Sequence, residues 1–502
     1  MYVILLLVAI VLAIIYYAFV EPVTYWHKNG VQQHCPLQIW KHNLVSLVQH
    51  QPIAEVFQNF YNSFPNARYS GIYQFLDKSL IIKDVELIKK ITIKDFDHFV
   101  NHKLFSIGEV LWERNLFSLK DDKWKQMRSI LSPSFTSSKM KMMFNLVSDC
   151  ADQLIDYFEN KLKSASCVTI EMKDVSTRFA NDVIASTAFG LTCDSLTNPN
   201  NEFYLMGREI IPQVGFWKNL QLLIIFNLPV LAQICGFRYL SKKASKYFLK
   251  TIKSTVRSRE QRKSVRYDMI HLLLEARERS KDNLTDLDIT AQALLFFFGG
   301  FDTVSTLMSF MAHELAVNVE IQNRLQKEVD ETLKQCGGAI TYDALFKMKY
   351  LDMVVSESLR KWPSAIVTDR VCSKAYKIPI EKPGEIPIYL KKGDVVWIPI
   401  YGLHRDPKHF PNPERFDPER FSEENKSELN ADAYIPFGAG PRSCIAIRFA
   451  LMETKLFFFK LLSSFDIVVV KQTAIPLKLA KVSFQLTAEG GFWVGLKPRK
   501  QK

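Results

Sequence analysis

The hydrophobic and polar positions divide the chain into an apolar N-terminal run and a long body in which helical periodicity prevails. Residues 1–20 carry no charged side chain, and Val3 to Val20 is just long enough to cross a bilayer as a helix. No Lys or Arg precedes this run and no clear small-x-small cleavage site follows it, which favours a membrane anchor over a cleaved signal peptide. Lys28 and Lys41 follow the run, so the positive-inside rule predicts that the body of the protein faces the cytosol. In a eukaryote the expected membrane is that of the endoplasmic reticulum.

The body of the chain is predicted to be mainly α-helical with a minor β portion. Helical patterns dominate from about residue 65 to 365, and no internal repeat or low-complexity tract occurs. Proline and charged residues between Asp406 and Phe421 predict a meandering loop. Short strand-like runs lie at 394–399, 482–486 and 491–496. The pattern thus predicts a membrane anchor (1–22), a linker (23–62) and one large domain (63–502).

A strongly basic segment lies between Lys242 and Arg266, where ten Lys and Arg residues accompany a single acid, Glu260. Four of the basic residues recur at helical spacing opposite apolar positions, which predicts an amphipathic helix with a solvated basic face. These four are Lys246, Lys250, Lys253 and Arg257. The net charge of +13 is compatible with nucleic-acid binding, but no aromatic platform for bases accompanies the segment. The pattern favours a membrane surface or a protein partner, and no nucleic acid.

The cysteine pattern argues against two kinds of site. Eight cysteines are scattered over 502 residues without paired spacing, and no Cys-x-x-Cys occurs. They are Cys35, Cys150, Cys167, Cys193, Cys235, Cys336, Cys372 and Cys444. This pattern argues against a disulfide framework and against a zinc site, and it favours a reducing compartment. Apolar residues make up 48% of the chain, which is enough to fill a large core.

A long apolar helix is predicted over 283–318, with a capping box at 285–288. The pair Gly299-Gly300 interrupts its middle, where each glycine costs about 1 kcal/mol relative to alanine. Thr303 lies four and three residues beyond these glycines, so they clear space on the face where its hydroxyl projects. Asp302 stands beside that face. A notch for helix packing is the structural alternative.

Cys444 ends the run Phe-Gly-Ala-Gly-Pro-Arg-Ser-Cys and stands at the entrance of an apolar helix predicted from Ile445 to Phe465. The positive end of a helix and the nearby Arg442 favour the thiolate, which is the form that binds metal. Glycines in the run leave the backbone bare, so a flat, bulky group can approach the sulfur. Taken alone, a cysteine is more simply explained as an inert core residue.

Four motifs in this chain resemble those of the cytochrome P-450 family. Phe-x-x-Gly-x-Arg-x-Cys at 437–444 resembles the haem-binding loop, and Gly-Gly-Phe-Asp-Thr at 299–303 resembles the oxygen-activation motif. Glu-x-x-Arg at 357–360 with Pro-Glu-Arg-Phe at 418–421 resembles the buried triad, and Trp-x-x-x-Arg at 124–128 resembles a propionate-binding helix. The resemblance covers about residues 25 to 497. It implies a cytochrome P-450 fold, mainly α with a minor β portion, preceded by an N-terminal transmembrane helix.

The resemblance also implies roles for individual residues. Cys444 would be the axial ligand of the iron of haem b, and Thr303 and Asp302 would assist oxygen activation. The implied structural triad is Glu357, Arg360 and Arg420. The implied cofactor-binding residues are Trp124, Arg128, Gly299, Gly300, Arg370, Phe437, Gly440 and Arg442, among which the arginines would bind the haem propionates. The implied pocket residues are Phe99, Phe117, Phe297, Phe298, Ile366 and Val367, although phenylalanines at helical spacing equally fit a core.

The implied activity is that of a monooxygenase that inserts one oxygen atom from O2 into a lipophilic small molecule. The chain has no flavin or nicotinamide fingerprint, so electrons are expected from NADPH through a separate reductase, with cytochrome b5 as a further candidate partner. Lys120, Lys123, Lys125 and Lys141 fit a docking surface for an acidic reductase, or simply a solvated face. The alternatives are an endogenous hormone or fatty-acid hydroxylase, a haem-thiolate isomerase and a non-catalytic haem sensor.

Two segments, 368–372 and 445–453, look most like membrane-bound insect members of the family related to the vertebrate drug-metabolising group. This likeness implies foreign compounds, such as insecticides or plant toxins, as the leading substrates. The apolar residues between Phe216 and Leu231 are expected to dip into the membrane beside an access channel. The chain departs from the family at Ala446, where glycine is usual, so that an additional methyl lies where the helix passes the porphyrin.

Overall fold

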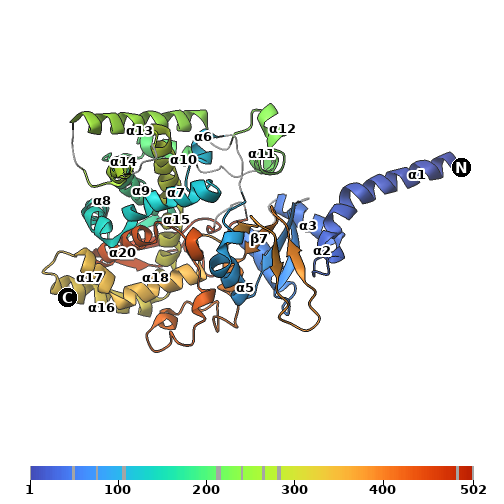
Figure 1. Ribbon diagram of the computed structural model, residues 1–502. Helices are drawn as coiled ribbons and strands as arrows, with labels where there is room; N and C mark the ends of the chain where they lie inside the picture. Colours follow the sequence, from blue (N-terminus) through green and yellow to red (C-terminus); the bar gives the residue numbers. More distant parts are fainter. Residues whose placement is uncertain are drawn as a thin grey trace.

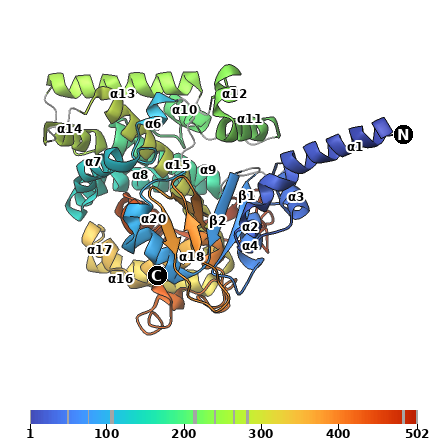
Figure 2. The same cartoon turned by 45° about the vertical axis from the view of Figure 1, so that its right-hand side comes forward.

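The computed structural model describes residues 2–47, 51–74, 77–103, 109–210, 216–238, 241–262, 266–279, 284–481 and 486–499. Figure 1 shows helices massed on one side of the molecule, a smaller region of sheet on the other, and the N-terminal helix projecting beyond the sheet. After a 45° turn, β1 and β2 lie between the N-terminal helices and the helical mass (Figure 2). The predicted combination of mainly α with minor β structure is confirmed.

Twenty α-helices lie within the described residues. The longer ones are α1 (Tyr2–Ile15), α3 (Pro36–Leu47), α4 (Ile53–Asn62), α7 (Asp121–Leu131), α8 (Ser137–Leu162), α9 (Met172–Ile184), α10 (Glu202–Ile210), α11 (Phe216–Asn227), α13 (Lys242–Arg262), α14 (Met269–Arg279), α15 (Asp286–Val317), α16 (Val319–Gln335), α18 (Lys349–Lys361) and α20 (Ile447–Ser464). The shorter ones are α2 (Tyr25–Lys28), α5 (Val85–Lys89), α6 (Val110–Glu113), α12 (Pro229–Ile234), α17 (Tyr342–Lys347) and α19 (Ile400–Leu403).

The strands form three small sheets in the described part of the chain. They are β1 (Tyr69–Gln74), β2 (Asp77–Ile82), β3 (Val168–Glu171), β4 (Thr368–Val371), β5 (Tyr376–Ile378), β6 (Ile388–Leu390), β7 (Val395–Ile398), β8 (Phe465–Val468) and β9 (Trp493–Pro498). The sheet orders are β1-β2-β7-β4, β3-β9-β8 and β5-β6. Strands β2 and β7 pair in parallel, and the other pairs are antiparallel.

The predicted strands at 394–399 and 491–496 are confirmed as β7 and β9. Residues 482–485 of the third predicted strand lie outside the described residues. Register places Arg370 of β4 opposite Val396 of β7, and Leu80 of β2 pairs with the same Val396 from the other side. Strand β7 therefore connects the strand that carries Arg370 to the N-terminal strands of the sheet.

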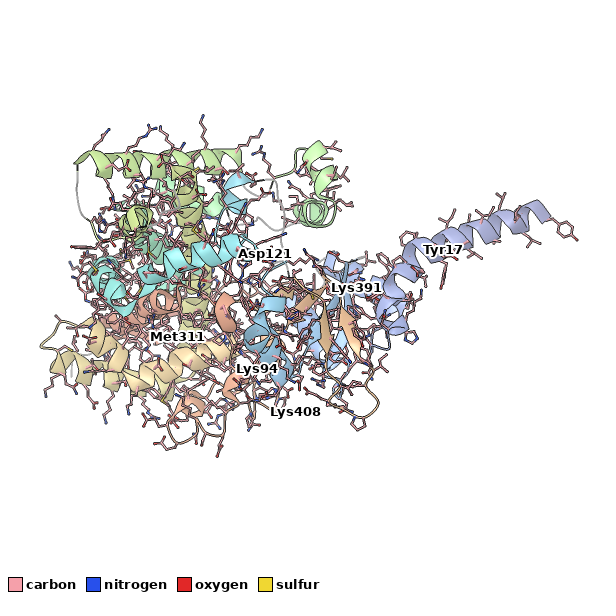
Figure 3. The ribbon with its side chains drawn as sticks, viewed as in Figure 1. Tyr17, Lys94, Asp121, Met311, Lys391 and Lys408 are labelled. Atoms are coloured by element: carbon pink, nitrogen blue, oxygen red, sulfur yellow. The ribbon has the colours of Figure 1, made fainter. Side chains whose placement is uncertain are left out.

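The long helix α15 confirms the prediction for 283–318 and runs through the centre of the helical side (Figure 1). Thr285 caps it, and Asp288 completes the capping box as the sequence predicts. The helix is apolar on nearly all sides because it is surrounded by other helices, with α9 its closest neighbour. Met311 of this helix is fully buried, whereas Tyr17 lies on the projecting N-terminal arm (Figure 3).

The N-terminal arm is a candidate membrane span. Within Ile4–Lys28, an 18-residue window has a mean hydropathy of 2.7 and none of that window is buried in the protein, which fits the predicted anchor. Helix α15 also passes the length and hydropathy test, but 67% of it is buried, so it is a core helix. In the expected linker, 23–62, Val23 and Trp26 are buried and three helices form. This segment thus packs against the sheet side.

The basic segment forms α13, as predicted from its amphipathic spacing. Ala244, Phe248, Ile252 and Val256 are buried, while Lys246 and Lys250 are exposed on the opposite face. The helix lies along the outer edge of the helical side (Figure 1). Its apolar stripe packs into the main core, and its basic face points to solvent.

Two hydrophobic cores flank the segment that carries Cys444. The larger core fills the helical side and includes Phe449 and Met452 of α20. The smaller core fills the sheet side and includes Ala433 and Ile435. Because the chain leaves one core at Ile435 and enters the other at Phe449, the loop between them lies at the junction of the two cores.

Candidate active site

The loop that carries Cys444 is shaped by two glycines in the left-handed conformation. Gly438 has φ +76° and Gly440 has φ +71°, which side chains rarely adopt. A Cβ at Gly440 would lie 1.8 Å from the Thr92 carbonyl oxygen, so this glycine also provides space for a close approach of two backbones. The Cys444 N–H donates to the Phe437 carbonyl over 2.9 Å and closes the loop. The loop therefore presents the sulfur from a constrained backbone.

Cys444 is accessible although the protein surrounds it closely. Its side chain is exposed, whereas burial raises the pKa of its thiol. The Ala446 N–H and the Arg128 guanidinium oppose burial and favour the thiolate. The sequence predicted that Arg442 would favour the thiolate. Instead, the Arg442 guanidinium donates to backbone carbonyl groups ahead of α7.

Three guanidinium groups meet around the cysteine loop. Arg128 of α7 donates to the Ser443 carbonyl over 3.0 Å, and Arg370 of β4 donates to the Ala439 carbonyl over 2.9 Å. Arg442 lies over the ring of Trp124, 4.1 Å from its centroid. These residues come from a helix, a strand and the loop itself, and the fold brings them to one place.

The guanidinium cluster carries more positive charge than the protein compensates. Burial and then the charge of Arg370 lower the pKa of Arg442 to about 9. Burial lowers the pKa of Arg370 to about 10, although Asp369 opposes it. The Nε atom of Arg370 has no hydrogen-bond partner among the described residues. Buried positive charges require anionic partners. The cluster therefore fits the two propionate carboxylates of a haem bound through Cys444.

The Gly299-Gly300 pair of α15 has two different surroundings. A Cβ at Gly299 would meet no atom within 4 Å, so the helix surface is open there. A Cβ at Gly300 would lie 2.8 Å from Ile184 Cδ1 of α9. The open space that the sequence predicted beside both glycines is thus present at Gly299. At Gly300 the prediction is wrong, because this glycine lets α15 pack closely against α9. Thr303 donates its hydroxyl to the Gly299 carbonyl, at the edge of the open surface.

Asp302 is turned towards α9 and is held by a lysine. Lys173 Nζ lies 2.7 Å from the Asp302 carboxylate and also donates to the hydroxyls of Ser305 and Thr306 over 2.9 and 2.7 Å. Asp302 is buried, so this contact fixes the direction of its carboxylate. Sequence reasoning missed Lys173, because the two residues are 129 positions apart and no local pattern connects them.

Glu357 and Arg360 form a buried bidentate ion pair within α18. Both are fully buried, and Arg360 Nε and Nη2 lie 2.8 and 2.7 Å from the two carboxylate oxygens. Arg420 Nε lies 3.4 Å from the same carboxylate. The Asp417 N–H donates to Glu357 over 2.9 Å, and Arg360 donates to the His404 carbonyl over 3.0 Å. The three expected triad residues are therefore in contact, and they tie α18 to the loop that leads to Cys444.

His404 connects α18 to the approach of the cysteine loop. Its Nδ1 lies 3.1 Å from the Arg360 carbonyl oxygen, and its Nε2 lies 3.0 Å from the Ile435 nitrogen. A neutral ring with its proton on Nδ1 satisfies both contacts. Burial lowers the pKa of His404 to about 3, so the ring is neutral near pH 7. Sequence reasoning missed this residue, because a lone histidine in a loop carries no pattern that distinguishes it from a surface residue.

A second missed pair, His102 and Asp369, lies beside the guanidinium cluster. His102 Nδ1 is 3.1 Å from the Asp369 carboxylate, and both residues are buried. The ring of Phe117 stacks on His102 at 4.9 Å. Since Asp369 precedes Arg370, this pair positions the strand end that carries one of the three guanidinium groups. The partners are 267 residues apart, and only the fold reveals the contact.

The six expected pocket residues separate into two groups. Phe99, Phe297 and Ile366 are core residues, only 0%, 1% and 6% exposed. Phe297, for example, would collide with a Cβ at Gly207, 2.3 Å from its Cζ. Phe117, Phe298 and Val367 are partly exposed. The prediction that Phe99, Phe297 and Ile366 line a pocket is therefore wrong, because these side chains belong to the core. Apolar side chains on a surrounded element face other elements as often as a cavity.

Glu453 is a fully buried acid on α20, the helix that follows the cysteine loop. Neither of its carboxylate oxygens has a hydrogen-bond partner among the described residues. Burial raises the pKa of this carboxyl well above its usual value, so the folded protein retains the proton to a higher pH than the unfolded chain does. The unfolded chain releases it, and the contribution of Glu453 to stability therefore falls as the pH rises above the ordinary range of a glutamate.

We expect Glu453→Met to stabilise the protein by about 1–3 kcal/mol at pH 8, because it removes an unsatisfied buried group at similar volume. The gain should be smaller at pH 5, where the unfolded chain holds more of the proton. Urea unfolding at the two pH values measures the difference. Equal destabilisation at both values would show instead that the carboxyl has a stabilising partner.

Comparison with known proteins agrees with this arrangement. A sequence profile described as Cytochrome P450 matches residues 35–493. Cytochrome P450 9e2 of Blattella germanica is 46% identical over 477 residues, which cover 89% of this chain and 88% of the relative. Probable cytochrome P450 9f2 of Drosophila melanogaster is 38% identical over 494 residues, which cover 95% of each chain. Cytochrome P450 6k1 of Blattella germanica is 35% identical over 504 residues, covering 96% of this chain and 94% of the relative.

Proposed function

Since this chain belongs to the cytochrome P450 family of haem-thiolate monooxygenases, we propose that it oxidises lipophilic foreign compounds with electrons from NADPH through a separate reductase. The observation that carries the proposal is the placement of Cys444. An accessible thiol sits on a constrained loop, and three guanidinium groups with unbalanced charge surround that loop. This donor set suits a haem that is bound through sulfur and anchored through its carboxylates.

The residues of the site divide the work between binding and proton handling. Haem, when bound, supplies the oxygen chemistry, and one atom of O2 is inserted into the substrate. Cys444 would hold the iron, and Arg128, Arg370 and Arg442 would bind the propionates through charge-assisted hydrogen bonds. The Gly299 carbonyl orients the Thr303 hydroxyl at the open surface of α15. This hydroxyl holds and passes a proton there.

Asp302 assists the proton transfer through Thr303. Its carboxylate is fixed by Lys173, 2.7 Å away, on the side of α15 that faces α9. Adjacent positions on a helix point about 100° apart, so Asp302 and Thr303 connect the packed side of the helix to its open surface. The buried position of Asp302 also separates it from bulk water.

The proposed substrates are lipophilic because the partly exposed residues near the site are apolar. Phe298 packs edge-on against Trp112 of α6, with ring centroids 5.3 Å apart. Val367 follows the end of α18, close in sequence to Arg370 of the guanidinium cluster. An apolar lining with few polar groups suits apolar ligands. Insecticides and plant toxins are the foreign compounds that we place first.

The proposed reductase docks at the exposed face of α7. Lys123 and Lys125 are exposed on this helix, and Lys120 precedes it. Arg128 of the same helix donates to the Ser443 carbonyl, so the basic face and the cysteine loop lie on two sides of a single helix. Lys125 lies 3.6 Å from Asp97 in an exposed ion pair, which is weak enough for a partner to replace. Cytochrome b5 is a second candidate for the same face.

The proposed location is the endoplasmic reticulum membrane, with the catalytic domain facing the cytosol. The helical stretch Ile4–Lys28, which begins within α1, provides the span. Apolar side chains of α11 and α12 are also exposed, with Trp217 and Ile234 both at 78% and Val230 at 70%. An apolar surface of this kind suits the interfacial layer of a bilayer. Lipophilic substrates would then reach the protein from the membrane.

Reconstitution tests this function. The full-length protein, loaded with haem and combined with an NADPH-dependent reductase in lipid, should form oxygenated products from lipophilic test compounds. Rearrangement of an organic peroxide without NADPH use, and without oxygen transfer to a second compound, would favour a haem-thiolate isomerase. Haem binding without NADPH use for any compound would favour a sensor.

We expect Thr303→Ala to bind haem normally but to release hydrogen peroxide, because the mutant lacks the hydroxyl that passes a proton at the open surface. Product formed per NADPH should fall by about 10²-fold, the lower end of the range found for loss of a proton-transfer group. Thr303→Ser retains a hydroxyl and serves as the matched control, which should keep most of the coupling. Unchanged coupling in the alanine variant would reject this role.

A further inference from the structure

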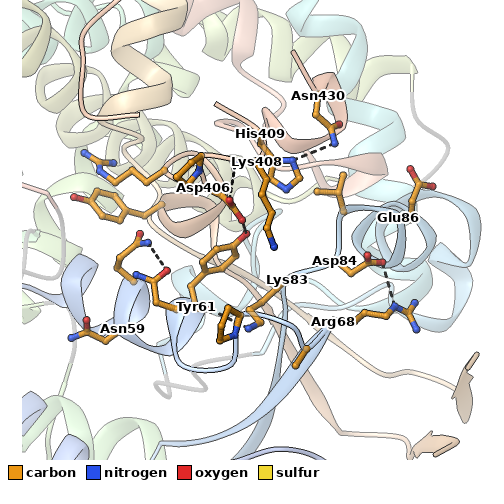
Figure 4. Close-up of a pocket in the computed structure, with 18 of the residues that line it drawn as sticks. Asn59, Tyr61, Arg68, Lys83, Asp84, Glu86, Asp406, Lys408, His409 and Asn430 are labelled. Carbon is orange, nitrogen blue, oxygen red and sulfur yellow. Dashed lines mark hydrogen bonds and ion pairs between the residues drawn. The ribbon is translucent and has the colours of Figure 1, made fainter. Parts of the chain in front are cut away.

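A wide polar cavity of about 990 Å³ lies on the sheet side of the molecule. It is bounded by α4, by the start of α5 and by the loop after α19, and no residue of the cysteine loop or of α15 lines it. Figure 4 shows lining side chains that are mostly polar or charged. This lining does not suit the lipophilic substrates proposed above. The cavity therefore requires a separate explanation.

Lys83 is a buried cation at this cavity. It is only 7% exposed, yet its ammonium group contacts only carbonyl oxygens, those of Tyr61 at 3.1 Å and of Phe64. No carboxylate among the described residues forms an ion pair with it. Burial, and after it the charges of Lys408 and Lys382, lower the pKa of Lys83 to about 8, although the charge of Asp406 opposes them. A buried cation without a compensating anion is costly. An anion bound next to the Lys83 ammonium group would therefore stabilise the protein.

Two more lysines add positive charge beside Lys83. Lys408 and Lys382 are both exposed, and both repel the ammonium group of Lys83. Figure 4 shows the Lys408 side chain directed into the cavity, beside Tyr61. Lys382 reaches the Asn66 carbonyl over 2.9 Å and has no ion pair among the described residues.

Three of the five carboxylates that line the cavity are already engaged. Asp406 accepts the Tyr61 hydroxyl over 2.7 Å and the Lys408 N–H over 2.9 Å. Asp84 accepts the Leu87 N–H over 2.8 Å and lies 3.7 Å from Arg68. Glu414 pairs with Arg405 at 3.2 Å, and Glu55 and Glu86 are exposed lining residues. Among these carboxylates, only that of Asp406 acts on the Lys83 ammonium group, against the two lysines Lys408 and Lys382, so the corner formed by the three lysines retains net positive charge.

We propose that the corner formed by Lys83, Lys382 and Lys408 binds a small multivalent oxyanion of the phosphate class. Lysine ammonium groups act as point charges that suit phosphate oxygens. An anion here would compensate the buried amine of Lys83 and screen the repulsion among the three lysines. The cavity is larger than inorganic phosphate, so a phosphomonoester with a polar body fits its amide-bearing rim, which includes Gln58, Asn59 and Asn62.

Calorimetric titration with pyrophosphate tests the site. The full-length haem-loaded protein in detergent micelles, without NADPH, should show saturable binding. Lys408→Ala should weaken it at least tenfold, because an exposed lysine is removed without loss of packing. Lys391→Ala is the matched control, since Lys391 is exposed, does not line the cavity and lies on another part of the sheet side (Figure 3). Its affinity should be unchanged.

Two results would overturn the proposal. One is the absence of saturable binding, and the other is equal weakening by Lys391→Ala, which would show a general charge effect. Lys83→Met gives a further check, with haem content confirming the fold, and unchanged affinity in this variant would also reject the site. The test needs no turnover, so its outcome is independent of the monooxygenase proposal.

Vesicles distinguish the two sources of such an anion. If the ligand is soluble, pyrophosphate and a soluble phosphomonoester bind in micelles and phosphatidic acid adds nothing to binding of phosphatidylcholine vesicles. If the ligand is a lipid headgroup, pyrophosphate still binds in micelles, phosphatidic acid vesicles bind the protein more tightly than phosphatidylcholine vesicles do, and Lys408→Ala removes the difference. Both results support an oxyanion site. Binding that Lys408→Ala leaves unchanged in both arms contradicts it.

Discussion

Cys444→Ser is expected to reduce NADPH-dependent product formation by at least about 10³-fold, the loss of about 4 kcal/mol of transition-state stabilisation. A serine hydroxyl stays protonated at neutral pH and donates far less electron density than a thiolate, so it does not replace sulfur as a ligand. The absorption difference spectrum of the reduced protein with carbon monoxide measures this directly. The variant should lose the signature of a thiolate-ligated haem.

A matched control separates ligation from the general loss of a thiol. Cys235→Ser removes an exposed cysteine that follows α12, and it should leave both the spectrum and the activity unchanged. If Cys444→Ser retained the spectrum of the unaltered protein, another residue would be the ligand. The proposed roles of the guanidinium cluster would then also fail, because they depend on the position of this sulfur.

Glu357→Gln is expected to lower the free energy of unfolding by about 3–5 kcal/mol, the usual cost of breaking a buried ion pair. Arg360 is fully buried, so the change leaves its guanidinium without a compensating charge. The contacts of Asp417 and Arg420 with the same carboxylate would weaken as well. The midpoint of urea unfolding should fall, and haem should be released earlier in the transition.

The control for this prediction is an exposed pair on another helix. Glu331 lies 4.0 Å from Lys327 at four-residue spacing, and both side chains are largely exposed. Glu331→Gln should therefore change stability by no more than about 0.5 kcal/mol. Arg360→Lys retains the positive charge but loses the bidentate contact with Glu357. We therefore expect a loss in the free energy of unfolding that lies between those of Glu331→Gln and Glu357→Gln. Equal effects of Glu357→Gln and Glu331→Gln would show that the buried pair adds no stability.

Local sequence patterns predicted the features that depend on neighbouring residues. The capping box of α15 needs only Thr285 and Asp288, three residues apart, and it forms as expected. The amphipathic spacing of α13 likewise determines which side is buried. The family was recognised from short motifs around Cys444, Thr303 and Glu357, because each motif combines residue types that a single local geometry requires.

Contacts between distant segments were outside the reach of such patterns. Lys173 meets Asp302, and His102 meets Asp369, only because helices and strands pack together. Phe297 has the same residue type and nearly the same position as Phe298, yet one is in the core and the other is partly exposed. A helix that is surrounded on all sides has apolar residues all around it. Its sequence therefore shows no hydrophobic periodicity that would identify the side facing a cavity.

By itself, the sequence determined the family, the N-terminal apolar span and the order of the motifs, since these depend on residue identity and on spacing within one turn or loop. The tertiary structure decided the environment of each group. It gave Gly299 and Gly300 different surroundings, because Ile184 lies against Gly300 alone. It also made Arg128, rather than Arg442, the cation that lowers the pKa of the thiol. Burial and charge depend on every segment packed around a group, and that packing is known only when the whole chain is folded.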